Sequence, residues 1–176
     1  MHALVVYESM YGNTRAVAEA IAAGLRSRMP VEVVDVGAAP AVLDDDVSLL
    51  VVGAPTHAHG MSKPETRRTA ADRGDPQRGV GSASIGLREW LAELGSAPAR
   101  VAVAAFDTRI KGPALLWGSA AKSAEGRLRK TGAHVLSPAE SFYLTGPRGP
   151  VYDNLAEGEL ERARTWGEQL GADLPS

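Results

Sequence analysis

Short apolar runs alternate along the chain with segments whose apolar residues recur at helical spacing. The run at residues 47–54 is almost continuously apolar, which is typical of a parallel strand buried on both faces. We expect five strands from such runs, the last of them interrupted around Ser137 and Pro138. Their expected bounds are residues 3–7, 31–36, 47–54, 100–106 and, in two pieces, 133–136 and 141–145.

Helical spacing is clearest after the first of these strands. Val17, Ile21 and Leu25 follow one another at every fourth position and form one apolar face. Further helices are expected where similar patterns end at a glycine, which readily closes a helix. The expected helices span residues 14–29, 84–94, 114–131 and 154–170. Residues 61–83, by contrast, carry many charged side chains and are expected to form one long loop.

This alternation of strands and helices predicts an α/β fold. Parallel strands need crossover connections, so we expect a doubly wound sheet of five parallel strands with helices on both faces. With 176 residues, the whole chain (1–176) is expected to form a single domain.

The composition narrows the functional classes. The chain is 44% hydrophobic and 23% charged, the profile of a globular domain, and its net charge of −2 gives no strong field that would attract nucleic acid or an anionic membrane. It contains no cysteine, which excludes disulfides, thiolate metal sites and a cysteine nucleophile. We find neither a signal sequence nor an apolar stretch of about 18 residues, and therefore expect a cytoplasmic protein without a membrane span.

The loop after the first strand carries the strongest functional signal. It combines hydroxyl and amide side chains with one glycine and leads straight into a helix; its residues are Ser9, Met10, Tyr11, Gly12, Asn13 and Thr14. Free N–H groups and the positive end of the helix dipole make such a loop suitable for a phosphate. Neither glycine-rich nucleotide motif is present, so a terminal monophosphate fits better than a pyrophosphate. The alternative is that Ser9 or Asn13 only caps the helix.

Residues 3–25 resemble the phosphate loop of the flavodoxin superfamily, in which a small residue, a glycine, an asparagine and a threonine wrap the phosphate of FMN. The segment Ser9-Met10-Tyr11-Gly12 is also similar to the tryptophan-repressor-binding-protein type of NAD(P)H:quinone oxidoreductase, a flavodoxin relative. The resemblance implies a flavodoxin-like fold with the strand order 2-1-3-4-5. It also implies that this fold binds FMN, with the phosphate held by the loop from Ser9 to Thr14. A dinucleotide-binding Rossmann domain would require the glycine fingerprint that is missing here.

A second loop follows the third strand, at the edge of the sheet where such folds bind ligands. In the quinone-reductase relatives a Gly-x-Pro-Thr opening lies along the flavin ring, and residues 53–56 match it. The resemblance implies that this loop borders the ring and that Thr56 hydrogen-bonds a ribityl hydroxyl or a ring amide. The candidates are Pro55, Thr56, His57, His59 and Gly60. The two histidines could suggest a metal instead, but their spacing is poor for coordination, and we expect no metal site.

A third loop is expected at the end of the fourth strand and contains Phe106, Asp107, Thr108 and Arg109. In flavodoxin-like proteins the equivalent loop encloses the pyrimidine side of the ring. This implies that Asp107 accepts from N3–H and that Arg109 lies near N1 and O2. The alternative is that Asp107 caps a turn and pairs with Arg109 or Lys111 at the surface. Trp117 follows a few residues later and is expected either beside the ring or in the core.

The resemblance implies FMN-dependent electron transfer, with a redox protein or NAD(P)H as partner. We favour an electron carrier and identify no catalytic residue, since the cofactor would carry the chemistry. An FMN-dependent NAD(P)H:quinone oxidoreductase and a cofactor-free flavodoxin-like interaction module remain the alternatives, so whether the protein is an enzyme stays open. The basic residues at 61–83, among them Lys63, Arg67 and Arg68, would dock a partner or contact NADPH.

Overall fold

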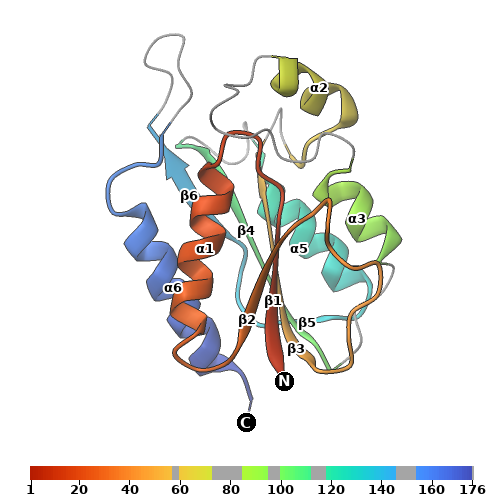
Figure 1. Cartoon of the computed structure of the whole chain (residues 1–176), viewed down its shortest axis with the longest axis vertical. Coiled ribbons are helices and arrows are strands. Elements are labelled where there is room, and N and C mark those ends of the chain that lie inside the picture. Colours follow the sequence, from red (N-terminus) through yellow and green to blue (C-terminus); the bar gives the residue numbers. More distant parts are fainter. Residues whose placement is uncertain (57–59, 73–84, 95–99, 112–117, 146–153, 176) are drawn as a thin grey trace.

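A computed structural model describes residues 1–56, 60–72, 85–94, 100–111, 118–145 and 154–175 (Figure 1). The sheet contains β1 (His2–Tyr7), β2 (Val31–Asp35), β3 (Val47–Pro55), β4 (Ala102–Ile110), β5 (His134–Val135) and β6 (Glu140–Leu144). Every pairing between these strands is parallel, and their order is β2-β1-β3-β4-β5, with β6 also paired to β4. The predicted parallel sheet and its strand order are confirmed.

β5 and β6 share one edge of β4. β5 pairs with the start of β4 at Ala102 and Val103, and β6 pairs with its second half, from Phe106 to Ile110. The two short strands are therefore successive parts of the interrupted last strand that the sequence predicted.

Helices cover both faces of the sheet, as predicted. α1 (Asn13–Leu25) and α6 (Glu159–Asp173) pack on one face, and α3 (Leu87–Glu93) and α5 (Ala120–Lys130) pack on the other (Figure 1). α2 (Pro64–Asp72) lies beyond the carboxyl end of the sheet, above α3 in the same view. In the part of the chain that the structure describes, no helix is both long and apolar enough to cross a membrane.

The central strand β3 shows why the sequence contains a continuous apolar run. Leu50 and Val52 belong to the core under α3 and α5, whereas Leu49 and Val51 belong to the core under α1 and α6. All four side chains are completely buried, because each face of the strand has its own layer of helices. The carboxyl ends of the parallel strands meet at one edge of the sheet, and the loops that follow them meet there too.

α1 and α6 approach each other closely at two glycines. A Cβ atom at Gly167 would lie 2.2 Å from the carbonyl oxygen of Ile21, and one at Gly24 would lie 2.1 Å from that of Arg164. Neither position has room for a side chain, since interiors are close-packed. This contact sets the position of α1 and therefore the place where its first turn meets the sheet edge.

The stretch at 61–83 is not the single loop that the sequence suggested. Its first part contains α2, which begins with Pro64 and carries Glu65 in its first turn, and both are favourable at a helix start. Arg67, expected among the exposed basic residues, is only 3% exposed and pairs with Glu89 on α3. The expectation of a basic surface here is wrong for Arg67.

Candidate functional site

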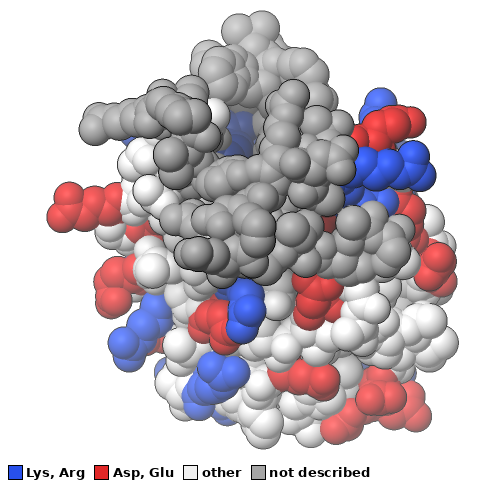
Figure 2. All heavy atoms as spheres, turned by 45° about the horizontal axis from the view of Figure 1, so that its top comes forward, with Lys and Arg blue, Asp and Glu red and all other residues white. Residues whose placement is uncertain are grey.

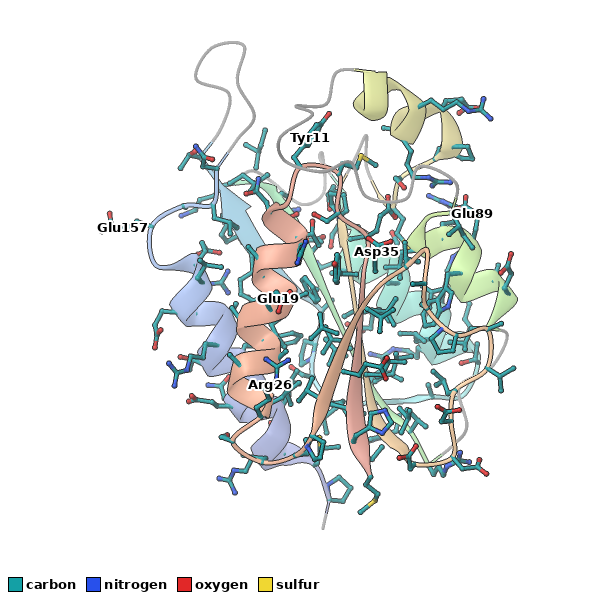
Figure 3. The ribbon with its side chains drawn as sticks, in the orientation of Figure 1. Tyr11, Glu19, Arg26, Asp35, Glu89 and Glu157 are labelled. Carbon is teal, nitrogen blue, oxygen red and sulfur yellow. The ribbon has the colours of Figure 1, made fainter. Side chains whose placement is uncertain are left out.

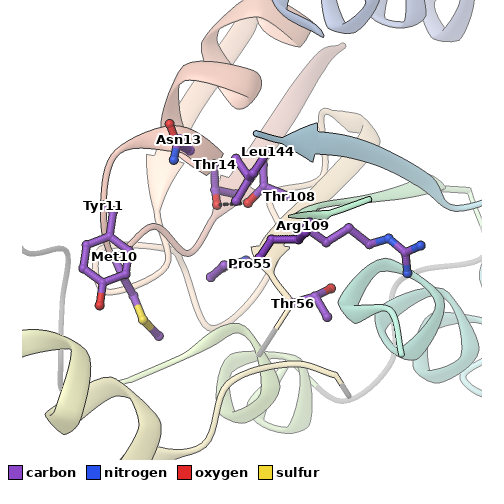
Figure 4. A pocket seen from close by; sticks show the side chains of 10 residues that line it. Met10, Tyr11, Asn13, Thr14, Pro55, Thr56, Thr108, Arg109 and Leu144 are labelled. Atoms are coloured by element: carbon purple, nitrogen blue, oxygen red, sulfur yellow. Dashed lines mark hydrogen bonds between the residues drawn. The ribbon is translucent and has the colours of Figure 1, made fainter. Parts of the chain in front are cut away.

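A pocket of about 270 Å³ lies where the first turn of α1 meets the carboxyl ends of β3 and β4 (Figure 4). Its lining combines apolar side chains with hydroxyl and amide groups, as ligand sites usually do. The lining residues are Met10, Tyr11, Asn13, Thr14, Pro55, Thr56, Thr108, Arg109, Ile110 and Leu144. The structure thus brings together residues from all three segments that the sequence singled out, although they are up to about 100 positions apart.

The N-terminus of α1 forms one end of this pocket. Its cap residue is Gly12, in the left-handed conformation with φ 86°, and no side-chain hydrogen bond caps the helix. Ser9 does not cap it, because the Ser9 hydroxyl accepts from the N–H of Gly12, at 3.1 Å, outside the helix. The first turn contains no acidic residue. Since first-turn N–H groups have no acceptor within a helix, this end of α1 suits an anion.

Thr14 and Thr108 join the helix to the sheet beneath the pocket. Their hydroxyl oxygens lie 2.8 Å apart in a hydrogen bond, drawn as a dashed line in Figure 4. Both residues are only 2% exposed. Thr108 was expected in a loop, but it lies in β4, paired with Pro55 of β3. This bond links the first turn of α1 to β4.

The hydroxyl group of Thr56 is already used within the protein. It donates to Oδ2 of Asp107, at 2.9 Å, and accepts from the N–H of Ala120, also at 2.9 Å. A hydroxyl has a single proton. Thr56 therefore lines the pocket as expected, but in this arrangement it can offer a ligand only a lone pair, not a hydrogen-bond donor.

Asp107 does not lie in a loop and does not line the pocket. It is a completely buried residue of β4, and its Oδ2 accepts from the hydroxyl groups of Thr56 and Ser119 and from the N–H of Ala121, 3.1 Å away. Neither sequence interpretation of Asp107 anticipated this role. The carboxylate supports the N-terminus of α5, where Ser119 is the cap residue and accepts from the N–H of Lys122.

Phe106 is likewise a strand residue, so the predicted third loop is wrong. β4 continues to Ile110 because β6 pairs with its second half. The Phe106 side chain is 1% exposed and packs edge-on against Phe142 and Trp166, with ring centres 6.1 and 6.5 Å apart. It faces the core under α1 and α6. A Cβ atom at Gly53 would lie 2.0 Å from this ring.

Arg109 lines the pocket, but its charged end is directed elsewhere. The guanidinium donates to the carbonyl oxygen of Gly118, at 2.6 Å, and points toward α5 (Figure 4). It also lies 5.9 Å from the ring centre of Tyr143. Arg109 is 7% exposed. The expected surface pair between Asp107 and Arg109 is therefore wrong, because both residues are buried.

The remaining candidates could not be placed in the pocket. His57, His59 and Trp117 lie outside the described residues. Gly60 is buried, and a Cβ atom there would lie 3.5 Å from the hydroxyl of Ser123 on α5. Among the residues that the structure does describe, no group of three or more His, Cys, Asp or Glu side chains could hold a metal ion.

Comparison with known proteins agrees with this geometry. A family model described as flavodoxin matches residues 5–166 of the chain, which include every described residue that lines the pocket. The chain belongs to the flavodoxin family. No curated protein matches its sequence.

Solved flavodoxins share the fold of this family member. A flavodoxin from the domain Archaea is 21% identical, with a TM-score of 0.65 and 99% of both chains covered. The flavodoxin of Streptococcus pneumonia TIGR4 is 17% identical, with the same TM-score over 98% of this chain and 99% of that one. Rubredoxin oxygen:oxidoreductase from Desulfovibrio gigas is 15% identical, with a TM-score of 0.63 over 99% of this chain but only 37% of that chain.

Sequence reasoning on this flavodoxin missed several residues around the site. Ile110 and Leu144 line the pocket, but both come from the paired ends of β4 and β6, and no local pattern reveals that pairing. Ser119 had a detectable signal, since a serine before a helix is a common cap. The predicted helix began too early for that signal to be used.

Proposed function

We propose that the protein binds FMN non-covalently at the carboxyl edge of its sheet and carries electrons between redox proteins. Membership of the flavodoxin family supports a flavin, and the pocket between α1, β3 and β4 supports its location. A bound flavin supplies reversible uptake of electrons, whereas the protein supplies binding, orientation and electrostatics. A single exposed ring edge and a docking surface are enough for a carrier.

The start of α1 is the observation that carries this proposal. α1, α3 and α5 all begin at the same edge of the sheet, and two of them receive a buried carboxylate. Glu8 accepts from the first N–H of α3, and Asp107 accepts from an N–H in the first turn of α5. The cap residue of α1, Gly12, makes no side-chain cap hydrogen bond, and Asn13 and Thr14 at the start of this helix line the pocket. A phosphate group would complete α1 as the carboxylates complete α3 and α5.

The residues around the ring remain those of the sequence prediction, with two exceptions. Pro55, Thr56, Thr108 and Arg109 line the pocket and remain candidates. The residues His57, His59, Gly60 and Trp117 also stay in the proposal. Phe106 and Asp107 leave it as side-chain contacts, because the first is packed into the core and the second supports α5.

Two flavins that differ only in the phosphate test the proposal. We expect the purified protein to bind FMN more tightly than riboflavin, as measured by quenching of flavin fluorescence. Asn13→Asp adds one negative charge to the first turn of α1 with almost no change of shape. It should weaken FMN binding at least about tenfold, or about 1.4 kcal/mol, and leave riboflavin binding within about twofold.

Ala23→Glu is the matched control for this experiment. It adds the same charge to the same helix at an exposed position about three turns away, and should leave both affinities unchanged. Failure of the wild-type protein to quench FMN at micromolar concentration would refute the proposal and favour the interaction module. Equal losses of both flavins in Asn13→Asp would refute the placement of the phosphate.

Anaerobic mixing with NADPH separates the carrier from the enzyme. For a carrier we expect no direct bleaching of the flavin by NADPH, and reduction only when a separate reductase is added. Rapid bleaching followed by turnover on a quinone would overturn the carrier assignment and establish the NAD(P)H:quinone oxidoreductase.

The described residues that are visible in Figure 2, around the grey part of the surface, carry acidic and basic side chains interspersed with one another. The net charge of the chain is only −2. We therefore expect docking to depend weakly on salt, because no large patch of one sign would steer the encounter.

A further inference from the structure

Four polar side chains form a cluster directly beside the loop that leads into α1. They come from four segments: Glu8 follows β1, Ser62 precedes α2, Arg67 lies on α2 and Glu89 lies on α3. Glu8, Ser62 and Arg67 are 2%, 0% and 3% exposed. Charged groups are seldom buried to this extent unless specific partners hold them.

Glu8 is held at both its backbone and its side chain. Its N–H donates to the carbonyl oxygen of Gly53, at 2.8 Å. One carboxylate oxygen accepts from the hydroxyl of Ser62, and the other accepts from the N–H of Leu87, the first residue of α3, at 2.9 Å. Glu8 therefore connects the end of β1 to β3, to the segment before α2 and to α3.

Arg67 completes the cluster. Its Nη1 donates to the hydroxyl of Ser62, at 3.0 Å, and lies 3.1 Å from a carboxylate oxygen of Glu89. Glu89 stands at the start of α3, on the side nearest α2 (Figure 3). A Cβ atom at Gly86 would lie 2.3 Å from Nη1 of Arg67 and 3.0 Å from a carboxylate oxygen of Glu8. The arginine fits only because residue 86 has no side chain.

Such a cluster is poorly explained by stability alone. Burial raises the pKa of Glu8, although the hydrogen bonds from Ser62 and Leu87 and the charge of Arg67 oppose the rise. Replacing buried ion pairs by apolar residues is often neutral or stabilising, so a cluster of this kind is better explained by the geometry that it imposes. The cluster would fix the position of Ser9, the residue that follows Glu8. Ser9 begins the loop, and its hydroxyl accepts a hydrogen bond from the N–H of Gly12.

We propose that Glu8 is a positioning residue for the phosphate-binding loop, whose side chain anchors the stem of that loop to Ser62 and to the start of α3. The inference rests on the proposed function, because it assumes that the loop from Ser9 to Thr14 holds a phosphate. Arg67 acts through Ser62 and keeps the anchor in place. A binding loop held before the ligand arrives loses less freedom on binding.

The test compares FMN with riboflavin in three variants and one control. Glu8→Ala removes both side-chain bonds, Glu8→Gln keeps a group of the same shape that can still bond Ser62 and Leu87, and Ser62→Ala removes one bond. Glu125→Gln is the control, because Glu125 also accepts from a backbone N–H, that of Ala139, and lies on α5, which packs on the opposite face of the sheet from α1.

We expect Glu8→Ala to lower the ratio of FMN affinity to riboflavin affinity about tenfold, and Ser62→Ala to lower it about threefold. Glu8→Gln should restore most of the ratio, and Glu125→Gln should leave it unchanged. An unchanged ratio in Glu8→Ala, or equal losses of both flavins, would overturn the proposal. If Glu8→Ala does not fold, Ser62→Ala decides by the same criterion.

A measurement without flavin keeps the two proposals separable. The N–H of Gly12 donates to Ser9 within the loop, so its hydrogen exchange reports on loop order. Glu8→Ala should speed exchange at Gly12 about tenfold relative to Glu125→Gln. If the wild-type protein binds neither flavin, the proposed function fails, and this exchange rate alone shows whether Glu8 positions the loop. Equal exchange at Gly12 in both variants would contradict the positioning role.

Discussion

α1 and α5 begin at the same edge of one sheet, yet they differ in the side-chain hydrogen bonds at their first turns. At α5 the N–H groups of the first turn all meet side chains: that of Ala120 donates to Thr56, that of Ala121 to Asp107 and that of Lys122 to Ser119. α1 has Gly12 as its cap residue, and no side-chain hydrogen bond caps it. One helix end has side-chain acceptors for its first three N–H groups, and the other has a glycine as its cap residue and lies at the pocket.

The difference separates stability from binding. A helix end that the protein satisfies itself contributes to the free energy of unfolding. A helix end that forms part of a ligand site contributes little to the free energy of unfolding in the ligand-free protein. Ligand binding at that end then stabilises the folded state. Substitutions at α5 should therefore act mainly on stability, and substitutions at α1 mainly on affinity.

Removing the Asp107 carboxylate, which accepts a hydrogen bond from the start of α5, should have the largest effect. Asp107→Ala leaves the half-buried hydroxyl of Thr56, the buried hydroxyl of Ser119 and the buried N–H of Ala121 without their acceptor. We expect a loss of about 3 to 4 kcal/mol in the free energy of unfolding, measured with urea. Asp35→Ala is the control, because Asp35 is also an aspartate of a parallel strand but makes an exposed bond to the N–H of Gly37; it should cost less than about 1 kcal/mol. Similar losses of stability in the two variants would contradict the claim that the Asp107 carboxylate specifically stabilises the start of α5.

Glu8, whose carboxylate accepts from the start of α3, should make the stability of the protein depend on pH, and this dependence can be measured. The pKa of Glu8 is raised, chiefly by burial, so the folded state holds the proton more tightly than the unfolded chain does. The stability that Glu8 contributes is fully present below its unfolded pKa and is lost as the pH rises through the folded pKa. Relative to Glu8→Gln, the wild type should lose up to about 1.4 kcal/mol per pH unit in that window.

Glu159 supplies a control of opposite sign for this titration. Burial favours a higher value, but the hydrogen bonds from Arg162 and the N–H of Tyr143 outweigh it and lower the pKa of Glu159. Relative to Glu159→Gln, the wild type should lose stability as the pH falls. Urea unfolding across the acid range measures both; the same pH trend for Glu8 and Glu159 would contradict the assignment.

The cap residue of α5 should have a moderate effect. Ser119→Ala removes the acceptor for the N–H of Lys122 and one donor to Asp107. We expect a loss of about 1 kcal/mol in the free energy of unfolding and no change in FMN affinity. Ser123→Ala, one turn further along the same helix, should cost less than about 0.5 kcal/mol. A change in FMN affinity in Ser119→Ala would show that the two helix ends are coupled.

The fold could be predicted because its signals are local. Apolar runs and helical spacing are properties of neighbouring residues, and they predicted the alternation of strands and helices, whereas the strand order came from the resemblance to the flavodoxin superfamily. The end of β4 could not be predicted in this way. Asp107, Thr108 and Arg109 interrupt the apolar run, and they remain in a strand because β6 pairs with all three and β3 pairs with the first two.

The residues of the candidate site could likewise be predicted where their signals are local, and could not where their partners are distant in sequence. The loop from Ser9 to Thr14 was recognisable because its residue types and the following helix are contiguous. The roles of Glu8 and Asp107 were not, because Glu8 bonds Leu87, 79 positions away, and Asp107 bonds Thr56, 51 positions away. A buried carboxylate at a strand end reads in sequence like any other acidic residue until the fold supplies its partners.

The smallest predicted effect on stability is also the most direct test of the comparison, because it makes α1 resemble α5. Asn13→Asp places a negative charge at the first turn of α1, where it interacts favourably with the helix dipole. The flavin-free protein should gain about 0.5 kcal/mol in its free energy of unfolding, although the same substitution is expected to weaken FMN binding. Ala23→Glu, in the last turn of the same helix, should leave FMN affinity unchanged and give no gain in stability, because a negative charge there meets the negative end of the dipole. A variant that lost both stability and affinity would mean that Asn13 supports the fold itself, and that α1 is not an end kept open for a ligand.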